Sequence, residues 1–151
     1  MRGDIVLFLA LVGVVGGAIV VAVVWLLGNG GGSSPCDNPL PPLGESAERS
    51  QAAFQEEDVA LTRVVEAAQA GNLTAVDQTF FGEVHNFTHN VDPPFREIDE
   101  DGAKDLCGAV IRLEEELAFD RRPDVIATEA TLVRDHIRDA AVALGYDRPG
   151  Q

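Results

Sequence analysis

Two of the three histidines in this 151-residue chain lie four residues apart, at His85 and His89 in the segment FFGEVHNFTHNVDPP (80–94). Residues at i and i+4 are neighbours on a helix surface, so both imidazoles could reach one metal ion. Asp92 follows His89 by about one turn, and His136 is the remaining imidazole. Imidazole suits zinc and copper, so these four side chains are candidate ligands for either ion.

The apolar residues of the same segment favour a different interpretation of the histidines. Phe80, Val84, Phe87 and Val91 are spaced by three or four residues, as on the core-facing side of a helix. On a helical wheel the histidines lie beside that stripe, so we expect a polar face that flanks the core or meets water. The metal site is the alternative, and a pH response is a third, because a helix C-terminus favours an imidazolium.

Four segments after residue 45 show helical periodicity, at about 46–70, 72–92, 101–118 and 123–144. The pair Pro93–Pro94 is expected to end the second segment, because the residue before a proline avoids the α region. A connector of about ten residues would follow. The sequence therefore predicts an all-α fold, with an up-down four-helix bundle over 45–145 and a disordered tail at 146–151.

The N-terminal region is apolar without a charge from Ile5 to Leu27. A helix of this length spans about 34 Å, enough to cross a membrane. A cleavable signal peptide is the competing interpretation, but the stretch is long for one. A retained transmembrane anchor over 1–27 is therefore expected. Gly13 and Gly17 have the G-x-x-x-G spacing of packed membrane helices. Because Arg2 precedes the span, the N-terminus should be cytoplasmic and the remaining chain outside.

Residues 28–44 are rich in glycine, serine and proline and are interpreted as a linker. Two cysteines, Cys36 in this linker and Cys107 in the third helical segment, are the only ones in the chain. In an oxidising compartment we expect them to form a disulfide, which would fasten the second half of the linker to the bundle.

The formal net charge of −14 argues against nucleic acid as a partner and favours cations or a basic protein. A membrane-embedded protein is the other expected partner, because the segment 1–4 before the span is too short for a cytoplasmic output domain. The acidic clusters 99–101 and 114–116 match no calcium-binding loop and are interpreted as a helix start and a solvated helix face. No enzyme motif occurs. The sequence predicts a single-pass cell-membrane protein that carries an extracytoplasmic interaction or sensing module without catalysis or a required cofactor. The alternative is a membrane-tethered metal-binding domain that uses His85 and His89.

Overall fold

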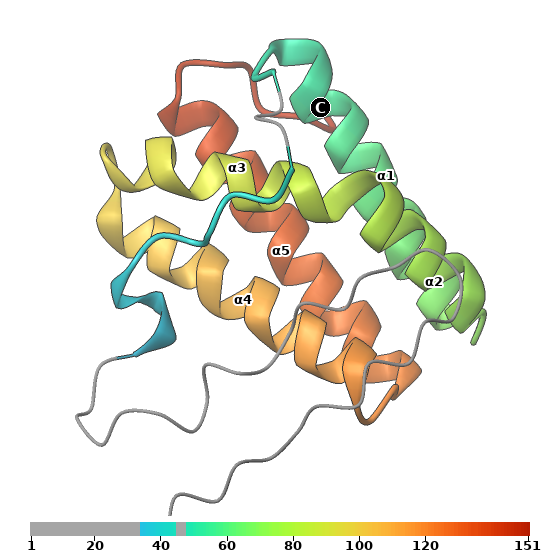
Figure 1. Ribbon diagram of the computed structural model, residues 1–151. Helices are drawn as coiled ribbons and strands as arrows, with labels where there is room; N and C mark the ends of the chain where they lie inside the picture. The colour runs from blue at the N-terminus through green and yellow to red at the C-terminus, as the bar shows by residue number, and fades with distance from the viewer. Residues whose placement is uncertain (1–33, 45–47) are drawn as a thin grey trace, which may run out of the picture. The chain divides into compact units, whose positions relative to one another are not determined.

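The computed structural model describes residues 34–44 and 48–151, and this part of the chain contains helices and no strand (Figure 1). It has four helical rods, of which the second combines α2, a π-helical turn η2 and α3 without a break. The elements are α1 (Gln51–Gln69), α2 (Leu73–Thr79), η2 (Phe80–Val84), α3 (His85–Arg96), α4 (Glu100–Ala118) and α5 (Pro123–Ala143). The predicted all-helical bundle is confirmed.

Local sequence signals explain where most of the rods begin and end. The side chains of Ser50, Asn72 and Asp99 each accept a backbone N–H from the first turn of α1, α2 and α4, as N-cap residues do. Gly71 and Gly145 follow α1 and α5 with φ of +70° and +87°, a conformation that glycine adopts without strain. These caps make the short connections between antiparallel neighbours possible.

The core is formed by the apolar stripes that the sequence predicts for the four rods. Their spacing places one stripe of each rod toward the bundle interior, where the side chains are withdrawn from water. Fully buried examples from the four rods are Phe54, Leu61, Phe80, Val84, Leu106, Leu113, Ile126 and Ile137. The stripes are therefore confirmed as the structural role of these residues.

The prediction that Pro93 and Pro94 stop the second rod is wrong, because α3 continues through both to Arg96. The α conformation of Asp92, the residue before the prolines, is held by contacts of its buried carboxylate. This carboxylate accepts hydrogen bonds from the Arg96 guanidinium at 3.0 Å and from the backbone N–H of Leu40 at 2.5 Å. These contacts outweigh the local preference, and the connection to α4 shortens to residues 97–99.

The predicted anchor over 1–27, with Gly13 and Gly17, lies outside the described residues. Among the helices that the structure does describe, none is long and apolar enough to cross a membrane.

Residues 34–44, here called the strap, form the second half of the predicted linker and pack on the bundle. A disulfide joins Cys36 to Cys107 of α4, with a Cα–Cα distance of 5.7 Å, which confirms the predicted pairing. The strap begins with a short 3-10 helix, η1 (Pro35–Asp37), and buries the side chains of Cys36 and Leu40. It is thus part of the folded domain.

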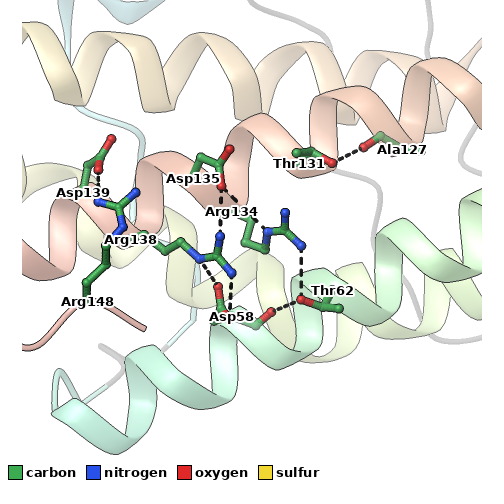
Figure 2. A network of polar contacts seen from close by, with 9 residues as sticks. All are labelled: Asp58, Thr62, Ala127, Thr131, Arg134, Asp135, Arg138, Asp139 and Arg148. Atoms are coloured by element: carbon green, nitrogen blue, oxygen red, sulfur yellow. Dashed lines mark hydrogen bonds and ion pairs between the residues drawn. The ribbon is translucent and has the colours of Figure 1, made fainter. Parts of the chain in front are cut away.

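The interface between α1 and α5 contains a network of charged and hydroxyl side chains (Figure 2). Arg138 donates from Nε and Nη2 to the two carboxylate oxygens of Asp58, at 2.5 and 3.2 Å. Beyond α5, the chain returns to α1, where Asp147 exchanges two hydrogen bonds with the Gln51 amide. The sequence predicted a disordered tail at 146–151, whereas these contacts hold its first residues against the bundle.

Candidate functional site

The two histidines meet one carboxylate from α4. His85 and His89 lie on α3, and their Nε2 atoms are 2.7 and 2.9 Å from the same oxygen, Oε1, of Glu114. One ligand atom from each of the three residues lies within 4.8 Å of the others. The imidazole rings themselves are perpendicular, with centroids 4.7 Å apart. We call these three residues the His–Glu cluster.

His89 is buried between the strap and α4, with 6 % of its side chain exposed. Its Nδ1 donates a hydrogen bond of 2.8 Å to the backbone carbonyl of Pro41 in the strap. Because a carbonyl only accepts, Nδ1 must carry the proton. His89 can then donate to Glu114 from Nε2 only as an imidazolium, whereas the neutral ring presents an Nε2 lone pair to the centre of the cluster. Of the two expected positions, facing water is wrong for His89, because the strap covers that side of α3.

His85 occupies the more open side of the cluster, and its side chain and that of Glu114 are each 22 % exposed. The rings of Phe80 and Phe81 both lie 5.3 Å from its imidazole, which limits the directions in which the ring can turn. The Thr88 hydroxyl donates to the His85 carbonyl at 2.9 Å. The cluster therefore has one side walled by aromatic rings and partial access for solvent.

Opposing effects act on the pKa of the Glu114 carboxyl group. Burial by itself raises it, because the charged form loses hydration. Hydrogen bonds from His85 and His89 and the positive charge of their protonated rings act in the other direction and lower the pKa to about 2. Glu114 is therefore a carboxylate across the ordinary pH range, as a metal ligand must be.

Two of the four candidate ligands from the sequence do not belong to the His–Glu cluster. Asp92 is fully buried, but both carboxylate oxygens serve the strap and Arg96. His136 lies on α5 and is not among the residues that converge. Only His85 and His89 are brought together as the i, i+4 spacing suggests.

The third member, Glu114, was interpreted from sequence as part of a solvated acidic face, which is wrong for two residues of the run. Glu114 turns toward α3, and Glu116 is buried against the Arg122 guanidinium, at 2.6 Å between Oε2 and Nη2. Only Glu115 is exposed. A useful signal was present, since Glu114 follows the buried Val110 by four residues and so lies near the core-facing stripe of α4.

The donor set of the cluster fits a transition metal. Two imidazoles and one carboxylate are the three protein ligands of one class of zinc sites, and copper(II) also accepts them. Ligands about 2.1 Å from a tetrahedral ion lie about 3.4 Å from one another. Glu114 would thus move away from the imidazoles by about 0.5 Å, while solvent on the side of His85 can supply a fourth ligand.

Searches against protein-family models, curated proteins and solved structures found no match for the chain.

Proposed function

We propose that this domain binds a divalent transition metal, zinc or copper, through His85, His89 and Glu114, without catalysis. The domain would be presented outside the cytoplasm by a transmembrane anchor at residues 5–27. The sequence favoured a general interaction or sensing module and kept metal binding as the alternative. The meeting of three ligands from two helices reverses that order.

The observation that carries the proposal is that both Nε2 atoms converge on one oxygen of Glu114, at 2.7 and 2.9 Å. Three groups that can each donate a lone pair once the two rings are neutral are held within 4.8 Å, so little chain entropy remains to be lost on binding. The hydrogen bond from His89 Nδ1 to Pro41 also matches the usual environment of a metal-bound imidazole, whose other nitrogen donates to an oxygen.

Two further features are consistent with this proposal. The disulfide between Cys36 and Cys107 is expected in an oxidising compartment, where it also keeps both thiols from competing for the metal. The net charge of −14 favours the approach of a cation at low ionic strength.

The test is a calorimetric titration of the full chain, in detergent micelles, with zinc and with copper(II). We expect one ion per chain, and at least a 100-fold loss of affinity in the His85→Ala/His89→Ala double variant, which removes two of three ligands. Glu114→Gln should also lose affinity, whereas Glu115→Gln, one residue away and exposed, serves as the matched control. Equal affinity in the wild type and the double variant would refute the proposal.

A protein-interaction role is the second candidate, and the observation in its favour is Phe119 at the end of α4. Its side chain is 65 % exposed beside a shallow pocket that is also lined by Arg112, Arg122 and Glu129. A photoreactive amino acid at position 119 should then crosslink to a membrane or extracytoplasmic protein in intact cells. A crosslinking pattern identical to that of the same probe at exposed Val59 would argue against this surface.

A further inference from the structure

The strap is attached to α3 along its whole length by polar contacts, and one of these reaches the His–Glu cluster. Four side chains of α3 bind strap backbone groups in register. Arg96 donates to the Cys36 carbonyl at 3.0 Å, Asp92 accepts from Leu40 N–H at 2.5 Å, His89 donates to the Pro41 carbonyl at 2.8 Å and Asn90 donates to the Leu43 carbonyl at 3.3 Å. A ligand of the proposed metal site is therefore also a docking contact of the strap.

The contact from His89 to Pro41 determines which nitrogen of this ring can bind a metal. When a metal ion takes the Nε2 lone pair, the single proton of the neutral ring must lie on Nδ1, where the Pro41 carbonyl accepts it. The lone pair is then on Nε2, which points at Glu114. Such outer contacts orient a ligand ring and raise its basicity, and losing one typically lowers metal affinity 10- to 100-fold.

The disulfide keeps this outer contact in place. Cys36 lies five residues before Pro41, and its bond to Cys107 prevents the start of the strap from leaving α4. A tethered segment docks at a much higher effective concentration than a free one. Without the tether, only the non-covalent contacts of Cys36, Leu40, Pro41 and Leu43 with α3 would order the strap.

From these observations we propose that the strap is a positioning element of the metal site, so that strap docking and metal binding strengthen each other through the bond between His89 and Pro41. This inference rests on the proposed function and adds its regulation. Affinity is highest when the Cys36–Cys107 tether is intact. By reciprocity, a bound metal tightens the strap against α3.

The first test compares zinc affinity in the full chain, in micelles, between the wild type and Cys36→Ala/Cys107→Ala, by competition with a chromogenic chelator. We expect about 10-fold weaker binding in the untethered variant. Asp58→Asn is the control, because it weakens the bundle at the α1–α5 interface, away from the strap, and should leave zinc affinity unchanged. Unchanged affinity in the untethered variant would overturn the inference.

The second test needs no substitution and therefore holds even if the untethered variant fails to fold. Hydrogen exchange of the Leu40 amide, which donates to Asp92, is measured in the wild type with and without zinc. Zinc should slow this exchange about 10-fold, as reciprocity with the first test requires. Exchange at Leu40 that zinc does not alter would contradict the coupling while leaving metal binding intact.

The third test reads the ring of His89 directly. Nitrogen-15 NMR of the zinc-bound chain should show a slowly exchanging Nδ1 proton on His89 in the wild type, because the Pro41 carbonyl holds it, and a faster exchanging one in the untethered variant. A merely structural role of the strap would leave this exchange rate unchanged. If zinc fails to bind the wild type at all, both the proposed function and this inference are wrong, whereas zinc binding with no difference in this exchange rate removes the inference alone.

Discussion

Two carboxylates, one buried and one partly exposed, each lie against two nitrogen atoms of another helix, and they differ in what holds them. Asp58 on α1 meets the single guanidinium of Arg138 on α5, which donates from two atoms (Figure 2). Glu114 on α4 meets two separate imidazoles on α3. Both arrangements supply hydrogen bonds to a carboxylate that has lost much of its contact with water. Without such partners, a charge in this position would be strongly destabilising.

The difference lies in whether the partner can change state. A guanidinium stays protonated in proteins and offers no lone pair, so the pair of Asp58 and Arg138 has one form and serves only to join α1 to α5. An imidazole has a charged form and a neutral form, and the neutral form binds metals. The charges at the interface of α1 with α5 are therefore fixed, whereas the interface of α3 with α4 contains two side chains that have a neutral as well as a charged form.

Arg138→Met gives the largest expected effect and tests the interface of α1 with α5. The substitution leaves Asp58 buried without its cationic partner, so we expect the free energy of unfolding to fall by about 3 kcal/mol. Arg148→Met removes an exposed ion pair with Asp139 and should cost less than about 0.5 kcal/mol. Urea denaturation measures both, and zinc affinity should be unchanged in both. Equal midpoints for the two variants would show that the buried pair does not stabilise the interface.

Acidification should destabilise the interface of α3 with α4 through protonation of Glu114. Its pKa is lowered from 4.5 to about 2 by folding. A lowered pKa means that the folded state releases the proton more readily, so the stabilisation is present above pH 4.5 and is lost as the pH falls toward 2. At about 1.4 kcal/mol for each pKa unit, this stabilisation should be at most about 3 kcal/mol.

Urea denaturation of Glu114→Gln between pH 6 and pH 2 checks this expectation. The variant has no carboxyl group to titrate at position 114 and should lose less stability on acidification than the wild type. Glu115→Gln, at an exposed position, should follow the wild-type profile. A profile of Glu114→Gln parallel to that of the wild type would contradict the assignment.

The smallest expected effect concerns Glu57, a buried carboxyl group that belongs to neither cluster. Burial raises its pKa well above the usual value, and the nearby charge of Glu83 adds to this. A raised pKa means that stability is full below about pH 4.5 and is lost as the pH rises through the folded value. Glu57→Gln should therefore stabilise the domain at pH 8 and have little effect at pH 4.

Thermal unfolding of Glu57→Gln at the two pH values measures this difference, with exposed Glu56→Gln as the control. Since Oε1 of Glu57 has no hydrogen-bond partner among the described residues, the amide loses no contact there. The same change in unfolding temperature at both pH values would show that charge is not the cause. The result shows whether a buried carboxylate without a basic partner destabilises the fold, in contrast to Asp58 and Glu114, which have nitrogen partners.

The rods could be predicted because their signals are local. The stripe of Phe80, Val84, Phe87 and Val91 requires only helical spacing, and the caps at Ser50, Asn72 and Asp99 require only a polar side chain before a helix. The continuation of α3 through Pro93 could not be predicted. It depends on Asp92 being held by Leu40 N–H, a contact across 52 residues of sequence.

The sequence by itself determined the helical periodicity, the i, i+4 pair of His85 and His89, and the two cysteines that form the disulfide. Only the tertiary structure decided that Glu114 is the third member of the cluster and that His136 and Asp92 are not. A helical wheel ranks the faces of one helix against an average interior. Which side chain from another helix meets a face, and whether a strap covers it, depends on packing between segments that are distant in sequence.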